Sequence, residues 1–457
     1  MAQSLLFKVK KCTPEFVTPS KPTPHEIKLL SDIDDQDGLR LQIPLIQFYK
    51  YDPNMEGKDP VDVIRKALAK TLVFYYPFAG RLREGVGRKL MVDCTGEGVL
   101  FIEADADVSL RDFGDTLLPT FPCLDELLYD VPGSSDVLNV PLLLIQVTRL
   151  KCGGFVFAIR LNHTMSDASG IVQFMNALGE ISRGRNEPSI SPVWCREFLN
   201  ARNPPRVTCI HPEIEQEHGN NNGTIISLDN MVQRTFFFGP VEVSKIHSLL
   251  STNMAYKYTK FEIITAFIWR CRIIALQPDL NEEVRMMSVV NARGTSFNLQ
   301  LPNGYYGNVI AYTVAVTLAR KLIENPLLYA LNLIKKLKAN VTKEYMHSLI
   351  DLMVIKNRPR FSMRGLFVVS NLRHSGFEDV DFGWGKAVYG GPANDSSFPG
   401  IVSYYLPFKN AKGEKGLVIP IHLPAQAMER FVKELDSVLK NNINKGDPTS
   451  RIIKSLL

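Results

Sequence analysis

Short apolar segments rich in β-branched residues alternate with stretches of helical periodicity in the first part of the chain. Gly, Pro or Asp bounds each short segment, which is typical of buried strands. Asp59 and Pro60 precede apolar residues at helical spacing, which predicts a helix capped by Asp59. The predicted strands cover residues 4–11, 43–51, 89–95, 99–105, 141–151 and 155–161.

The pattern breaks between residues 184 and 230, where scattered Pro, Gly, Asn and charged residues show little periodicity. The periodic segments then resume, and 457 residues exceed what one hydrophobic core usually supports. We therefore predict an α/β protein of two similar-sized domains, 1–183 and 231–457, each a mixed sheet flanked by helices, joined by a long crossover at 184–230. In the second domain the predicted strands lie near 231–239, 284–292, 307–318, 366–370, 400–408 and 416–422, and helices begin at Asn325-Pro326 and near Pro424.

Charge and cysteine content exclude several classes of protein. The net charge of +6 is small for this length and no Lys/Arg block occurs, so a nucleic-acid partner is not expected. Seven scattered cysteines without a CxxC pair suggest neither a disulfide framework nor a metal site. Lys8, Lys10 and Lys11 interrupt the only early apolar run, and no stretch suits a membrane span, so we expect a cytoplasmic protein.

One motif joins a predicted strand to a predicted helix. The buried strand 155–161 leads to His163-Thr-Met-Ser-Asp167, and residues 171–181 follow at helical spacing. A histidine held on such a turn at a domain edge can present a free ring nitrogen to a cleft, as a general base requires. Two interpretations of His163 stay open at this point: a catalytic base, or a core histidine satisfied by the backbone. Asp167 suits a helix cap or a buried ion pair better than a proton carrier.

The HxxxD spacing is weak by itself, because it occurs twice in this chain. His347 and Asp351 have the same spacing, but they lie inside a long helical pattern. Residues four apart share a helix face, so we interpret this second pair as a structural surface pair. The context of His163, and not its spacing to Asp167, makes it the candidate base.

A second motif, Asp381-Phe-Gly383-Trp384-Gly385, combines two glycines with a large aromatic anchor. Such a segment predicts a turn with unusual backbone angles. It offers no nucleophile and no metal ligand, and its spacing is not that of a phosphate-binding loop. Taken alone, the motif indicates a structural turn.

The two motifs, in this order and at this separation, resemble those of the plant BAHD acyltransferase family. The resemblance covers the whole chain and is closest to the alcohol acyltransferases and benzyl alcohol O-benzoyltransferases. It implies an acyl-CoA-dependent O-acyltransferase that esterifies an alcohol with an acetyl, aliphatic or benzoyl group. Further stretches that carry it are Tyr76-Pro-Phe-Ala-Gly-Arg-Leu82, Thr265-Ala-Phe-Ile-Trp-Arg270, Leu301-Pro-Asn-Gly-Tyr-Tyr-Gly-Asn308 and Leu30-Ser-Asp-Ile-Asp-Asp-Gln36.

The resemblance also implies roles for single residues. His163 would be the catalytic base, and Asp167 would turn away from the site into a salt bridge with Arg293. Asn291 stands where the family often has an acidic residue, which leaves further ion pairing of Arg293 open. The motif residues Asp381, Gly383, Trp384 and Gly385 would shape the solvent channel at a distance from the chemistry. Weaker candidates are Ser370 and Asn371 for the acyl carbonyl, and Thr259 and Lys260 for the coenzyme A phosphates, where a solvated surface is the alternative.

A single base suffices for the implied reaction. The thiolate of coenzyme A is a good leaving group, so His163 can take the hydroxyl proton and return it to sulfur. No GxSxG segment is present, and no covalent acyl-enzyme is required. We expect acyl-CoA as a co-substrate, no separate cofactor or metal, and a monomer. Acyl transfer to an amine and a non-catalytic homologue stay as alternatives, and a hydrolase is disfavoured because no nucleophile is evident.

Overall fold

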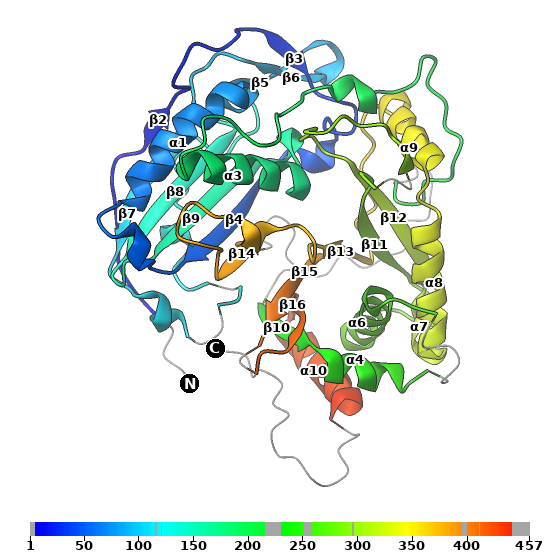
Figure 1. Ribbon diagram of the computed structural model, residues 1–457. Helices are drawn as coiled ribbons and strands as arrows, with labels where there is room; N and C mark the ends of the chain where they lie inside the picture. Colours follow the sequence, from blue (N-terminus) through cyan, green and yellow to red (C-terminus); the bar gives the residue numbers. More distant parts are fainter. Residues whose placement is uncertain are drawn as a thin grey trace.

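The computed structural model describes residues 5–114, 117–119, 121–214, 230–250, 257–294, 297–394, 400–410 and 412–440. Two large sheets dominate it, one of seven and one of six strands, with a small three-stranded sheet beside the first (Figure 1). Parallel and antiparallel pairs occur in both large sheets, so the predicted α/β class with two mixed sheets is confirmed. Part of the predicted linker, residues 215–229, lies outside the described residues.

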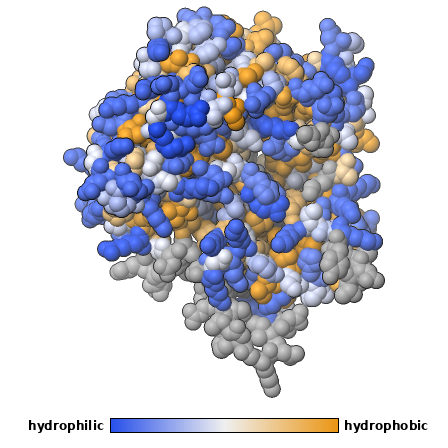
Figure 2. All heavy atoms as spheres, viewed as in Figure 1, coloured by the Kyte–Doolittle hydropathy of each residue, from blue (hydrophilic) through white to orange (hydrophobic). Residues whose placement is uncertain are grey.

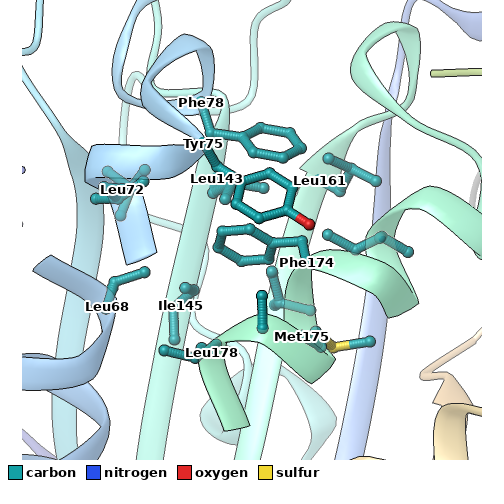
Figure 3. Packing of buried hydrophobic residues seen from close by; sticks show 14 of the residues in the cluster. Leu68, Leu72, Tyr75, Phe78, Leu143, Ile145, Leu161, Phe174, Met175 and Leu178 are labelled. Atoms are coloured by element: carbon teal, nitrogen blue, oxygen red, sulfur yellow. The ribbon is translucent and has the colours of Figure 1, made fainter. Parts of the chain in front are cut away.

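The seven-stranded sheet forms mainly from the first part of the chain. Helices α1 (Pro60–Phe74) and α3 (Ala168–Ser182) pack against each other and cover one face (Figure 1). Their apolar faces form a core with β8 and β9, where the aromatic rings of Tyr75, Phe78 and Phe174 meet edge to face or stacked (Figure 3). The strands run in the order β1 (Val9–Lys11), β7 (Val99–Ala106), β8 (Leu143–Leu150), β9 (Phe155–Asn162), β4 (Gln42–Tyr49) and β14 (Tyr389–Pro392), with β2 (Glu15–Val17) also on β7.

The six-stranded sheet carries helices α6 (Lys260–Leu276), α8 (Leu327–Ala339) and α10 (Ala425–Leu439) in one packed group (Figure 1). Its order is β10 (Met231–Phe238), β16 (Lys415–Pro424), β15 (Val402–Lys409), β13 (Leu366–Asn371), β11 (Glu283–Asn291) and β12 (Ile310–Leu318). The other helices of the described residues are α2 (Leu124–Leu127), α4 (Pro240–His247), α7 (Ala319–Glu324) and α9 (Lys343–Ile355). The small sheet is β3 (Ile27–Leu29), β6 (Leu90–Asp93) and β5 (Arg81–Glu84). Short 3-10 turns are Asp37–Leu39, Pro53–Met55, Tyr76–Ala79, Val86–Arg88, Leu110–Phe113, His163–Met165, Arg196–Leu199 and Phe377–Asp379.

Most predicted elements are present within a few residues of their predicted bounds. Asp59 caps α1 as expected, its side chain accepting a hydrogen bond from the Val61 amide at 3.2 Å. The first predicted strand, 4–11, is shorter than predicted, since only Val9–Lys11 forms a strand and residue 4 lies outside the described range. Strand β14 was not predicted from the sequence. It comes from the C-terminal part of the chain, yet it pairs with β4 of the first sheet. The domain boundaries at 183 and 231 stay a prediction.

Hydrophilic side chains cover most of the face seen in Figure 2, with hydrophobic ones showing in separate patches. This distribution is ordinary for a folded protein, which always leaves some apolar surface exposed. Among the described helices, none combines the length and apolar character that a membrane span needs.

Candidate functional site

His163 occupies a tight turn between β9 and α3. Its backbone amide donates to the Leu41 carbonyl at 2.9 Å, which extends the pairing of β9 with β4 by one step. The buried side chain of Asn162 caps the short turn His163–Met165 by accepting from the Thr164 amide at 3.3 Å and its hydroxyl at 2.7 Å. The turn therefore has a fixed geometry before any substrate binds.

The two ring nitrogens of His163 lie in different surroundings. Nδ1 is buried, whereas the residue as a whole stays partly exposed. Nε2 is not among the buried unpartnered atoms, and no hydrogen bond to it is found in the described part of the chain. Burial lowers the pKa of His163 from its ordinary value of 6.5, against the opposing effects of the backbone of His163, the Asp167 charge, the backbone of Ser166 and the Asn308 side chain. The imidazole is therefore neutral near pH 7 and able to accept a proton.

Asp167 faces away from a proton-transfer role, because all its contacts are structural. One carboxylate oxygen caps α3 by accepting from the Gly170 amide at 3.1 Å. The other accepts from Arg293 Nη1 at 2.6 Å and from the Val309 amide at 2.9 Å. Asn291 accepts from the Arg293 amide at 3.0 Å and donates to Ser169 at 2.9 Å. Asp167 thus joins the start of α3 to the two strands β11 and β12.

We expect Asp167→Ala to lower the free energy of unfolding by about 2–4 kcal/mol, because it removes a cap and a largely buried ion pair. Asp167→Asn keeps an oxygen that can accept from the Gly170 amide, so its free energy of unfolding should fall less. Arg293→Ala should also destabilise the protein, since it leaves the Asp167 carboxylate unpaired. Urea unfolding of the three variants measures these losses. Unchanged midpoints for Asp167→Ala and Arg293→Ala would mean that the ion pair contributes no stability.

A second buried network supports the same turn from behind, and sequence reasoning assigned it no role. Asp34 is fully buried and accepts from Arg196 at 3.1 Å and from the amide and side chain of Asn308, both at 2.8 Å. The Asn308 side chain also donates to the His163 carbonyl at 2.9 Å. Arg196 donates to the Met165 carbonyl at 2.8 Å and lies over the Trp194 ring at 4.4 Å. Three distant segments therefore hold the backbone of the turn that carries His163.

This packing is so close that two positions require glycine. A Cβ on Gly307 would lie 1.3 Å from Arg196 Nη1, and a Cβ on Gly170 would lie 2.0 Å from the Tyr306 carbonyl oxygen. Gly307 belongs to the loop before β12, and Gly170 to the first turn of α3. The two parts of the chain thus meet backbone to backbone at the site. The sequence contains both glycines, but it does not indicate that the loop before β12 packs against the first turn of α3.

The Asp381–Gly385 motif forms a turn at the far end of α3. One Asp381 oxygen accepts from the Gly383 amide at 2.7 Å and the Gly385 amide at 2.9 Å, and both glycines have positive φ, 116° and 79°. Trp384 packs edge to face on Phe155, with ring centroids 5.2 Å apart. The Asp381 carbonyl accepts from Arg183 just beyond α3. Since α3 has 15 residues, this turn lies about 20 Å from His163 along the helix.

No hydrogen bond or ion pair found in the described residues joins the four weaker candidates to His163. Thr259 caps α6, its hydroxyl accepting from the Glu262 amide at 3.3 Å, and the exposed Lys260 begins the helix. Ser370 and Asn371 end strand β13, where Ser370 is half-buried and Asn371 exposed. Their roles toward a ligand stay a prediction.

The second HxxxD pair is structural, but the predicted surface pair is wrong. Asp351 is fully buried and accepts from the Arg202 side chain at 2.6 Å and from the Arg206 amide at 2.9 Å. His347 is therefore not its main partner. The error arose because α9 buries this side of the helix under residues 202–209, which helical spacing does not reveal.

Near this pair, Ser348, His211 and Glu213 have the spacing of a hydrolase triad. His211 lies 2.9 Å from the Ser348 hydroxyl and 2.9 Å from the Glu213 carboxylate. Ser348 is fully buried, however, and its oxygen already accepts from the amides of Thr208 and Cys209. A nucleophile needs access to its substrate, so this cluster fastens the linker to α9. In the described residues no cluster of His, Cys, Asp and Glu is arranged to hold a metal ion.

Comparison with known proteins agrees with this geometry. The model of the Transferase family matches residues 7–438. A benzyl alcohol O-benzoyltransferase of Petunia hybrida is 62% identical over 443 residues, covering 96% of this chain and 96% of its own. The solved structure of vinorine synthase is similar in fold, with a TM-score of 0.71 at 22% identity over 94% of this chain and 98% of its own. TRI101 of F. sporotrichioides, solved with coenzyme A and T-2, has a TM-score of 0.65 at 19% identity, covering 89% and 97%. The chain therefore belongs to the Transferase family, and its resemblance to the plant BAHD acyltransferases is confirmed.

Proposed function

We propose that the protein transfers an acyl group from an acyl-CoA directly to an alcohol, with His163 as the general base. The class of reaction follows from the related benzyl alcohol O-benzoyltransferase, which is 62% identical. The observation that supports the base is the asymmetry of the imidazole: Nδ1 is buried in a side chain that as a whole stays partly exposed, and no hydrogen bond occupies Nε2 in the described residues. A neutral imidazole in that state can take one proton at one defined atom.

The proposed step is a single displacement. The alcohol oxygen attacks the thioester carbonyl while Nε2 takes its proton, and the tetrahedral intermediate expels the thiolate of coenzyme A. A thiol of this kind has a pKa of about 8.5, so the imidazolium can return the proton to sulfur or release it to water. The fixed turn contributes by holding the base in one place before the substrates arrive.

Benzoyl-CoA with benzyl alcohol is the first substrate pair to test, because the Petunia hybrida relative is named for these groups. Acetyl-CoA and longer acyl-CoAs, each with short and aromatic alcohols, complete the donor and acceptor matrix. Mass spectrometry of the products distinguishes esters from amides when matched amines are included as acceptors. Amide products without esters would favour the N-acylating alternative, and no acyl transfer to any acceptor would favour a non-catalytic homologue.

Activity should fall as the pH drops through the pKa of His163. Since burial lowers that pKa, the acidic limb of kcat/KM should have its midpoint below the ordinary histidine value of 6.5. The same group should destabilise the fold in acid, because the unfolded chain binds the proton more readily than the folded protein below about pH 6.5. Steady-state rates from pH 4.5 to 8 measure the limb. A midpoint above 6.5 would contradict a base desolvated in this way.

Other parts of the assignment rest on the family resemblance and stay proposals. Thr259 and Lys260 are proposed contacts of the coenzyme A phosphates, and Ser370 and Asn371 of the acyl carbonyl. Lys260 is exposed at the first turn of α6, where a phosphate would also meet the positive end of the helix dipole. We also propose a cytoplasmic monomer that uses coenzyme A thioesters as co-substrates and needs no metal.

A further inference from the structure

The amide of Asn308 has a fixed orientation beside His163. Its nitrogen donates to the Asp34 carboxylate at 2.8 Å and to the His163 carbonyl at 2.9 Å. Both partners are acceptors, so a flipped amide would place its oxygen against a carboxylate and a carbonyl. The nitrogen is thus bound to the backbone of the turn, and the oxygen is left on the other side of the amide.

Two buried polar atoms remain unpaired at this point. Asn308 Oδ1 and His163 Nδ1 are both buried, and neither has a hydrogen-bond partner among the described residues. One is an acceptor and the other carries a hydrogen in one of the two neutral tautomers. Leaving both atoms without a hydrogen bond would cost free energy, and a hydrogen bond between them would satisfy both.

We propose that Asn308 is the positioning residue of His163: its Oδ1 accepts the hydrogen on Nδ1 and thereby leaves Nε2 as the nitrogen that takes the alcohol proton. The inference rests on His163 acting as the base. Asp167 cannot fill this role, because its oxygens are occupied by Arg293, Val309 and Gly170. The HxxxD motif therefore supplies the histidine, and its orienting group comes from residue 308, 145 positions further along the chain.

The charges behind the amide support the same arrangement. Asp34 accepts from the Asn308 nitrogen, which polarises the amide and makes Oδ1 a stronger acceptor. Arg196 lies 3.1 Å from the Asp34 carboxylate and compensates its charge inside the protein. The Asn308 side chain also raises the pKa of His163 against the larger effect of burial. The chain of contacts thus favours the imidazolium that forms during proton transfer.

Nitrogen NMR of the full-length protein with ¹⁵N-labelled histidine tests the proposal without any substrate. The chain has eight histidines, and His163→Ala assigns the signal of residue 163. In the wild type we expect the neutral Nδ1–H tautomer. Asn308→Ala should mix the tautomers, lower the pKa of His163 and reduce kcat by about 10–100-fold, as for lost partners of metal-bound histidines. The KM for the acyl-CoA should change little.

Exchanging the Asp34 carboxylate with the Asn308 amide should shift the pKa of His163 in the opposite direction. The double variant Asp34→Asn/Asn308→Asp keeps one amide and one carboxylate in contact but puts the carboxylate beside the imidazole. It should raise the pKa of His163 above the wild-type value. Ser166→Ala is the matched control, since it removes a hydrogen bond of 2.7 Å from the same turn to Tyr306 and keeps the Ser166 backbone, which raises the pKa of His163. The tautomer and the pKa of His163 in Ser166→Ala should equal those in the wild type.

Three results would overturn the proposal: an unchanged His163 tautomer and pKa in Asn308→Ala, equal shifts in Ser166→Ala, or no rise of the pKa in the exchange variant. If Asn308→Ala does not fold, the pKa of His163 in the exchange variant alone tests the proposal. Full activity of His163→Ala would instead remove the proposed function, and the NMR result would still report whether Asn308 fixes the tautomer.

Discussion

His163→Ala should lower kcat by about 10²–10⁴-fold, the usual contribution of a general base, while the protein stays folded. The alanine removes the group proposed to accept the hydroxyl proton. The turn itself depends on backbone contacts to Leu41 and Asn308, which alanine keeps. Steady-state kinetics with circular dichroism and a melting curve on the same preparation check both halves of the prediction.

A matched control for this variant is His347→Ala, which changes a partly exposed histidine of the other HxxxD sequence. Its kcat should stay within about twofold of the wild type, since surface substitutions usually have small effects. A folded His163→Ala enzyme with more than a tenth of the wild-type kcat would contradict the role of His163.

Arg196→Met should lower the free energy of unfolding by about 3–5 kcal/mol, the usual cost of leaving a buried charge unpaired. The side chains of Arg196 and Asp34 are only 2% and 0% exposed, so water cannot replace the lost guanidinium. The variant also loses the hydrogen bond to the Met165 carbonyl, so kcat should fall as well. Denaturant unfolding and kinetics on one preparation measure the two effects.

Two further variants separate charge from packing in this experiment. Arg285→Met removes an arginine that is 20% exposed, pairs with Glu283 and donates to the Pro212 carbonyl at 3.1 Å, so its loss should be clearly smaller than that of Arg196→Met. Asp34→Asn/Arg196→Met removes both buried charges and should recover part of the stability, because no ion is left unpaired. Equal destabilisation by Arg196→Met and Arg285→Met would show that the buried pair has no special energetic role.

Local signals in the sequence predict the turn that carries His163, but not the groups that position it. The strand 155–161, the histidine and the helix after Asp167 follow one another, so hydrophobic periodicity and capping suffice to predict them. Asp34 and Asn308 are 274 residues apart, so only the tertiary fold brings them into contact. No spacing rule connects them, and each alone is typical of a turn residue.

The lack of a local signal also explains why helix α6 and strand β14 were not predicted from the sequence. Helix α6 is apolar on nearly all sides because it lies inside the packed group of helices, so it lacks the one-sided pattern that marked α8 and α10. Strand β14 has only four residues, two of them glycine and one proline, and it forms by pairing with β4 from the other end of the chain. Long-range pairing overrides local preference at such short strands.

The most direct test of the central claim is a single-turnover experiment that follows thiol and ester together. Wild-type protein and His163→Ala are each mixed with benzoyl-CoA, with and without benzyl alcohol. Direct transfer by His163 predicts that the wild type releases thiol only when alcohol is present, at the rate at which ester appears, and that His163→Ala forms neither at a comparable rate. A burst of thiol without alcohol, or equal rates in both proteins, would contradict it.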